Sequence, residues 1–162
     1  ARPIEGNNLL DTLQLTTQKF DRIEISAPFD VIVEKGDHYG VKIIGESDVI
    51  PEVFAEVKNN TLLLSTSNNV KFFGNAMDRT QLIVTTKDIS EIYVLGSAKV
   101  SSTSNVESKH LSLELMVQVR LVLPSKAELY VDITGSGNVE LNGNCKIIKG
   151  KVIGSGILHT KQ

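Results

Sequence analysis

The chain has 162 residues, of which 41% are apolar and 22% charged, so it is long enough and apolar enough to fold as one globular domain. A net charge of −2 argues against the basic field that binding to nucleic acid or anionic lipid requires. Aromatic residues make up only 5% and Trp is absent, which disfavours stacking sites for sugars or single-stranded nucleic acid.

Short strands dominate the N-terminal half. They are predicted at 20–25, 29–34, 41–45, 54–57 and 61–64. Residues 49–53 are predicted to form one helical turn at most, because they include Pro51 and β-branched side chains. Residues 65–75 are predicted to form a loop whose Phe72 and Phe73 pack onto the core.

The clearest strand pattern runs from Leu111 to Leu123. All seven odd-numbered positions are Leu or Val, whereas most even positions are polar. Such alternation places one face in the core and the other in water, and it predicts a single strand of thirteen residues that ends before Pro124.

A glycine-containing motif recurs in the C-terminal half. Two Gly-Ser-Gly triplets begin at Gly135 and Gly154, and weaker copies begin at Gly96 and Val117, so the motif returns at nearly regular intervals. A strand-rich unit recurring at about 20 residues is typical of stacked, solenoid architectures. Glycine at these points favours corners with positive φ or a close backbone approach.

These patterns predict an all-β fold, a single-stranded parallel β-helix (β-solenoid) with coils of about 18–21 residues over the single domain 1–162. Residues 1–19 are expected to form an N-terminal cap or lead-in, 20–90 irregular coils, and 91–162 regular Gly-Ser-Gly coils. Stacking in coils of about 18 residues would place Leu113 beside Val131 and so keep the apolar positions aligned.

The order of the parts is specific even though each part is weak. The parts are Phe20-x-x-Ile23-x-Ile25, the run from Phe29 to Gly36, Val57-x-x-Asn60-x-Leu62, and the repeats at Gly96, Gly135 and Gly154. From about Phe20 to Leu158 this order resembles the bacterial family called putative autotransporter adhesin, head GIN domain; the copy at Val117 departs from its repeat.

The resemblance implies a right-handed, pectin-lyase-like β-helix in a protein of the cell envelope or a secreted protein. It provides no catalytic residues that could be transferred to this chain. The residues themselves also argue against a catalytic or zinc site. His38, His110 and His159 lack zinc-site spacing. The single cysteine, Cys145, has no predicted catalytic partner. No catalytic residue, metal or cofactor is expected.

The best candidate for ligand binding is an outward face carrying Glu114, Asp132, Arg120 and Gln118. With coils of about 18 residues, Glu114 would lie beside Asp132, and such a carboxylate pair could bind a cation. Two solvated side chains on a sheet face are the plainer interpretation of the same pair.

The favoured hypothesis is a non-catalytic, exported module of the cell envelope, adhesin-like or structural, with a surface glycan or protein as its partner and no role in binding nucleic acid. No apolar run reaches the length of a membrane span, roughly 18 residues, so an anchor is expected upstream of this segment, if there is one. A homo-oligomer is compatible with the sequence. The alternative is a carbohydrate-active enzyme, a polysaccharide lyase or hydrolase, which rests on fold analogy alone.

Overall fold

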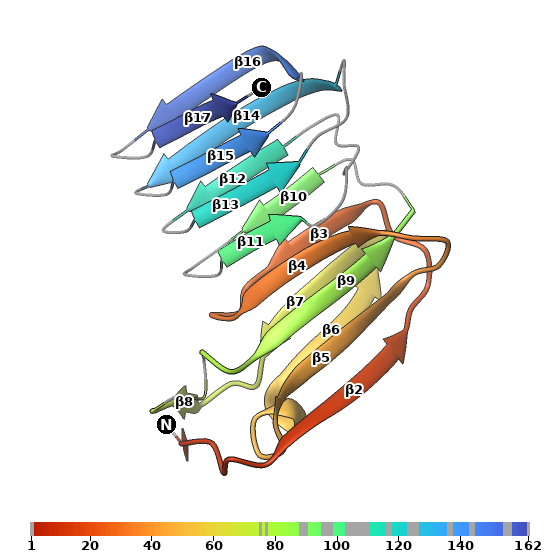
Figure 1. The fold of residues 1–162 in the computed structure, drawn as a ribbon, viewed down its shortest axis with the longest axis vertical. Coiled ribbons are helices and arrows are strands. Elements are labelled where there is room, and N and C mark those ends of the chain that lie inside the picture. Colours follow the sequence, from red (N-terminus) through yellow and green to blue (C-terminus); the bar gives the residue numbers. More distant parts are fainter. Residues whose placement is uncertain are drawn as a thin grey trace.

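The structure, a computed structural model, is built almost entirely of β-strands (Figure 1). It describes residues 2–74, 76, 78–87, 91–94, 99–102, 111–115, 118–122, 127–135, 138–142, 145–153 and 157–161. The first elements are β1 (Arg2–Ile4), β2 (Leu10–Thr16), β3 (Arg22–Ile25), β4 (Asp30–Lys35), β5 (Gly40–Glu46), the 3₁₀ turn η1 (Ile50–Glu52), β6 (Val53–Lys58), β7 (Thr61–Thr66), β8 (Val70–Phe72) and β9 (Gln81–Thr86). The later strands are β10 (Glu91–Val94), β11 (Lys99–Ser102), β12 (Leu111–Leu115), β13 (Gln118–Val122), β14 (Ala127–Gly135), β15 (Asn138–Asn142), β16 (Cys145–Ile153) and β17 (Ile157–Lys161).

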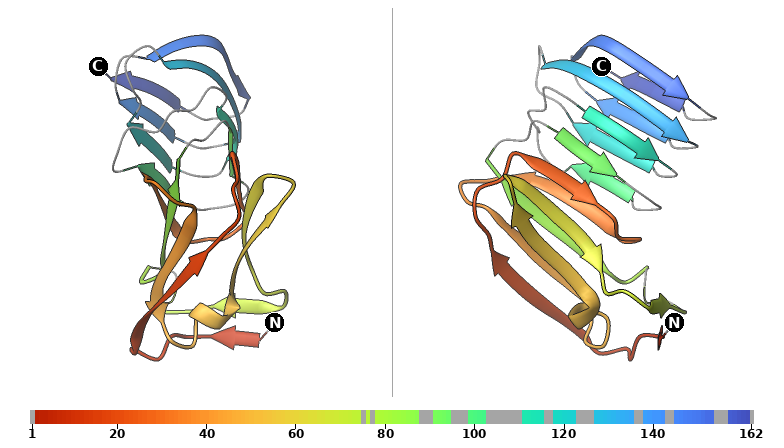
Figure 2. Two further views of the ribbon diagram at one scale, coloured as in Figure 1. Left: turned by 90° about the vertical axis from the view of Figure 1, so that its right-hand side faces the viewer. Right: turned by 180° about the vertical axis from the view of Figure 1, so that it is seen from behind.

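The described strands form four open sheets arranged in two facing layers (Figure 2). One layer is an eight-stranded sheet in the order β17-β15-β13-β11-β4-β9-β5-β2. The opposite layer consists of a four-stranded sheet, β10-β3-β7-β6, followed by a three-stranded sheet, β12-β14-β16, with β12 lying beside β10. The short pair β1-β8 lies at the N-terminal end.

One row of apolar residues crosses the whole eight-stranded sheet. In spatial order this inner row is Leu13, Ile43, Leu82, Val31, Val100, Val119, Val139 and Leu158. The four members from Ile43 to Val100 are at most 1% exposed. An adjacent residue on each strand belongs to the opposite face, because neighbours in a strand alternate. This outer row is Gln14, Lys42, Ile83, Ile32, Ser101, Arg120, Glu140 and His159.

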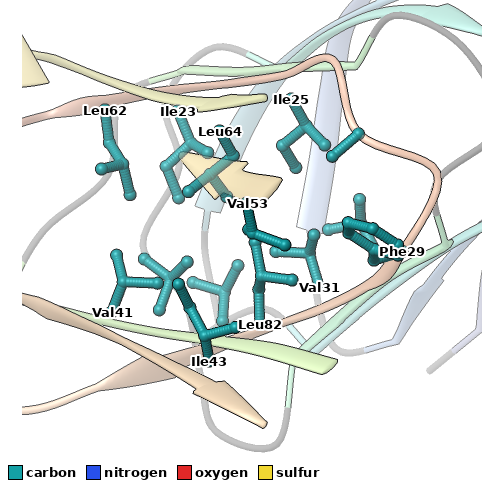
Figure 3. Close-up of a cluster of buried hydrophobic side chains, with 14 of the residues drawn as sticks. Ile23, Ile25, Phe29, Val31, Val41, Ile43, Val53, Leu62, Leu64 and Leu82 are labelled. Atoms are coloured by element: carbon teal, nitrogen blue, oxygen red, sulfur yellow. The ribbon is translucent and has the colours of Figure 1, made fainter. Parts of the chain in front are cut away.

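The core fills the space between the two layers at the N-terminal half (Figure 3). Ile23 and Leu62 from the four-stranded sheet face Val31, Ile43 and Leu82 from the eight-stranded sheet, and all five are fully buried. Their burial removes apolar surface from water on both sheets at once, which is the main favourable contribution to such a two-layer fold.

Strand β1 and the turn η1 close the N-terminal end of this core. Ile4 of β1 is buried, and Arg2 places its guanidinium Nη2 2.6 Å from the Glu52 carboxylate. Hydrogen bonds donated by Ser67 and then Arg2 to the Glu52 carboxylate lower the pKa of Glu52 below its usual range. One ion pair thus joins the first strand to the segment that leads into β6.

The strand predictions for the N-terminal half are confirmed by β3 to β7, and η1 is the predicted single helical turn. The predicted loop 65–75 is wrong in part, since β7 extends to Thr66 and Val70–Phe72 forms β8. Phe72 packs edge-on against Phe29 with ring centroids 5.2 Å apart, as predicted. Phe73 instead remains 41% exposed.

The predicted right-handed, single-stranded parallel β-helix, pectin-lyase-like or otherwise, is wrong. The eight-stranded sheet is mixed, because β5 pairs antiparallel with both β2 and β9, and β6 pairs antiparallel with β7. The β6–β7 connection consists of Asn59 and Asn60 with φ of 51° and 59°, which is the positive-φ pair of a two-residue hairpin turn. Such a turn returns the chain alongside itself and cannot lead to a parallel coil.

The division that assigns regular Gly-Ser-Gly coils to 91–162 stays a prediction, but the strands described there follow an alternating order. After residue 110 the chain alternates between two sheets: β12, β14 and β16 lie in one, and β13, β15 and β17 in the other. The predicted strand 111–123 is therefore two strands in different sheets, β12 and β13. Gly135 ends β14, while the rest of the predicted glycine corners lies outside the described residues.

Truncating the inner row should cost much more stability than truncating the outer row. Leu82→Ala empties a fully buried position and is expected to lower the free energy of unfolding by about 2–5 kcal/mol. Ile83→Ala, the next residue on the same strand and half-buried on the outer face, is the control and should lose much less. Urea denaturation measures both, and equal losses would contradict the two-layer packing.

The Glu52 carboxylate should make folding sensitive to acid. Its lowered pKa means that its contribution is fully present above the unfolded pKa of about 4.3 and is lost as the pH falls through the lower folded value. Native protein should therefore exceed Glu52→Gln in Tm at pH 6, and this difference should shrink as the pH falls toward 3. Ser67→Ala, which removes the largest cause of the lowered Glu52 pKa, should move the loss to higher pH. A difference between native protein and Glu52→Gln that is constant with pH would contradict this prediction.

Candidate functional site

The four residues predicted to bind a ligand lie in two different sheets. Glu114 in β12 and Asp132 in β14 belong to the three-stranded sheet. Gln118 and Arg120 share β13 in the eight-stranded sheet of the opposite layer. Each sheet thus holds two of the four residues, so they do not form one constellation. Their role in binding stays a prediction.

The predicted pairing of Glu114 with Asp132 is wrong. In the register between β12 and β14, Glu114 lies opposite Thr134 and Asp132 lies opposite Ser112, so the strands are offset by two positions more than predicted. On its other side Asp132 lies opposite Lys151 of β16. The predicted offset between paired residues came from the spacing of the motifs. Among the described C-terminal strands, only Ala127 to Leu129 of β14 pair with β16 at that offset, and the register shifts between Leu129 and Tyr130.

Polar side chains occupy paired positions across the C-terminal strands. Along the outer row, Arg120 of β13 pairs with Glu140 of β15, and Glu140 pairs with His159 of β17. Opposite charges in directly paired positions stabilise a sheet by roughly 0.2–1 kcal/mol each. The eight-stranded sheet therefore offers a line of polar positions of both signs on the face that points away from the inner row.

A buried carboxylate, Glu46, and a half-buried one, Asp48, lie close together where the chain leaves β5. Glu46, the last residue of β5, is 1% exposed, and Asp48 follows it in the turn before η1. The Gly6–Asn8 segment crosses over both: Gly6 N–H donates to Asp48 Oδ2 at 3.1 Å and Asn8 N–H donates to Glu46 Oε1 at 3.1 Å. Arg79 approaches Glu46 Oε1 at 3.3 Å. Glu46 and Asp48, with Gly6, Asn8 and Arg79, are called the carboxylate cluster below.

Sequence reasoning missed this cluster. The only signal was a run of polar residues, Glu46-Ser47-Asp48, directly after a strand, and such runs usually mark a solvated turn. The burial arises from the Gly6–Asn8 segment, which is forty residues away in the chain and has no motif.

Apolar side chains are exposed on the strands at the two sheet edges of the N-terminal end. Leu10 and Leu13 of β2 are 65% and 41% exposed, and Phe54 of β6 is 48% exposed. Both strands are terminal in their sheets, so their outer backbone groups have no strand beside them among the described residues. Exposed edges of this kind are templates for contact with another chain.

Catalytic or metal-binding groups of the usual kind do not gather in the described part of the chain. No three His, Cys, Asp or Glu side chains come together there. His38 lies 3.0 Å from the exposed Asp37 carboxylate, and this hydrogen bond lowers the pKa of Asp37 below its usual range. None of the helices in the described ranges has the length and apolar character needed to cross a bilayer.

Solved structures share this fold at low sequence identity. One, described as a putative lipid binding protein from Parabacteroides distasonis ATCC 8503, aligns with a TM-score of 0.57 and 14% identity over 99% of this chain and 100% of that chain. A putative cell adhesion protein from Clostridium sporogenes ATCC 15579 gives 0.57 and 15% over 94% and 98%. A putative adhesin from Parabacteroides merdae ATCC 43184 gives 0.55 and 16% over 99% of both chains.

No curated protein matches the chain. A family model matches residues 19–162, from the residue before Phe20 to the last residue, and so includes the carboxylates of the cluster and the outer row from Lys42 to His159. The chain belongs to the family described as "Putative auto-transporter adhesin, head GIN domain".

Proposed function

We propose that the chain is a non-catalytic adhesion module of the cell envelope that acts after export. The observation that carries the proposal is the family match, which spans residues 19–162 and so the greater part of the chain. Two structural neighbours are described as a putative adhesin and a putative cell adhesion protein, and these descriptions support the same role.

The proposed binding face is the outer row of the eight-stranded sheet around Gln118 and Arg120. Arg120 of β13 and Glu140 of β15 place opposite charges in paired positions there, and the polar His159 of β17 lies beside Glu140. Complementary charges steer and orient a protein partner. Sugar-binding sites usually present aromatic faces, which are scarce in this chain at 5%, so a surface protein is the favoured partner and a glycan is the alternative.

Binding to arrays of host and bacterial surface proteins, with a glycan array alongside, identifies the partner. The Gln118→Ala/Arg120→Ala double variant should weaken that binding at least about tenfold, a loss of about 1.4 kcal/mol. Glu114→Ala/Asp132→Ala tests the opposite sheet and should have little effect. Lys58→Ala, which removes an exposed positive charge on β6, is the matched control for the loss of the Arg120 charge.

Each half of the proposal has an outcome that overturns it. Full binding by the Gln118→Ala/Arg120→Ala variant would remove the site, although the role in adhesion would stand. Fractionation of the source cells with antibody against the domain tests export. Protein found only in the cytoplasm, or turnover of a polysaccharide by the native domain, would overturn the proposed function itself.

A further inference from the structure

The carboxylate cluster contains two buried oxygens that lack a partner. Glu46 uses Oε1 for Asn8 N–H and Arg79, and Asp48 uses Oδ2 for Gly6 N–H. Glu46 Oε2 and Asp48 Oδ1 are buried and accept no hydrogen bond from the described residues. A buried carboxylate oxygen without a partner costs free energy, because water no longer solvates it.

The local charges do not balance. Glu46 and Asp48 contribute two negative charges, and Arg79 is the one cation within ion-pairing distance among the described residues. The Arg79 side chain is 42% exposed and contacts Oε1 alone, so it leaves Oε2 without compensation. Neighbouring polar side chains are already engaged, since Asn7 Nδ2 donates to Ser47 Oγ at 2.7 Å.

Both carboxylates contact Gly6, where a side chain would collide with Glu46. Gly6 has a φ of +86°, and a Cβ atom there would lie 1.7 Å from Glu46 Oε2. Glycine at this position therefore permits the segment to approach Glu46 closely. The N–H of Gly6 also donates a hydrogen bond to Asp48 Oδ2 at 3.1 Å. The two unsatisfied oxygens are thereby held on neighbouring carboxylates of one short turn.

We propose that Glu46 Oε2 and Asp48 Oδ1 bind a divalent cation of the calcium type. Carboxylate oxygens are the ligands that such hard cations prefer, and one divalent ion would satisfy both oxygens and offset the excess negative charge. Ca²⁺ accepts irregular coordination at about 2.3–2.6 Å more readily than Mg²⁺ does. With two protein carboxylates and water as the other ligands, binding falls in the weak class of extracellular modules, with a Kd of about 0.1–1 mM.

Thermal unfolding of the whole 162-residue chain, freed of metal with EDTA and then dialysed, tests the site when CaCl₂ is added at constant ionic strength. A Tm rise of about 3–6 °C is expected at ten times the Kd, and isothermal titration should show saturable binding of one ion. MgCl₂ should give a smaller shift. Asp48→Asn and Glu46→Gln should each abolish the Ca²⁺-dependent shift.

Asp11→Asn, which neutralises an exposed carboxylate on β2, is the matched control and should keep the full shift. If Glu46→Gln does not fold, Asp48→Asn decides, since Asp48 is only half-buried. Folded native protein that shows neither a Tm shift nor heat of binding up to 20 mM Ca²⁺ (roughly twenty times the upper Kd) overturns the proposal. A shift that persists in both variants overturns the assignment to these oxygens. None of these measurements depends on adhesion, so their outcome is separate from that of the proposed function.

Discussion

The continuity of the inner row is the constraint on which the rest of the structure depends. Eight strands contribute one apolar residue each to this row, from Leu13 at one edge to Leu158 at the other. Its register is kept through parallel and antiparallel pairing alike, because any slip by one residue would exchange the inner and outer rows. The polar sites are consequences of this row. Arg120 and Glu140 lie on the outer face because Val119 and Val139 occupy the inner one.

The sequence predicted which residues face inward much better than it predicted which strands are neighbours. Alternation along 20–25 and 29–34 depends only on local geometry, and β3 and β4 bear it out. Alternation across Leu111–Leu123 could not reveal that the chain changes sheet between β12 and β13, because the alternating pattern is continuous across both strands. The pair Asn59-Asn60 did contain a local signal for an antiparallel hairpin, which outweighs the motif spacing that favoured parallel coils.

The same limit applies to the candidate sites. The register that pairs Arg120 with Glu140 depends on contacts between strands, so motif spacing misplaced the polar partners by two residues. The carboxylate cluster depends on a segment that meets Glu46 from a different part of the chain. Burial of a charged group by such a segment has no signature in the residues that flank it, and only the three-dimensional structure reveals it.

The place of β9 has a consequence for the order in which the chain can fold. Strands β4 and β5 follow one another in sequence, yet β9 lies between them, parallel to β4 and antiparallel to β5. During synthesis, β4 and β5 therefore lack the strand that joins them in the sheet until β9, which ends at Thr86, has been made. The facing edges of β4 and β5 have to stay apart over that interval instead of closing on each other as a hairpin. We expect slow formation of this sheet and dependence of the nascent chain on protection from other strands, as is usual for non-local β pairing.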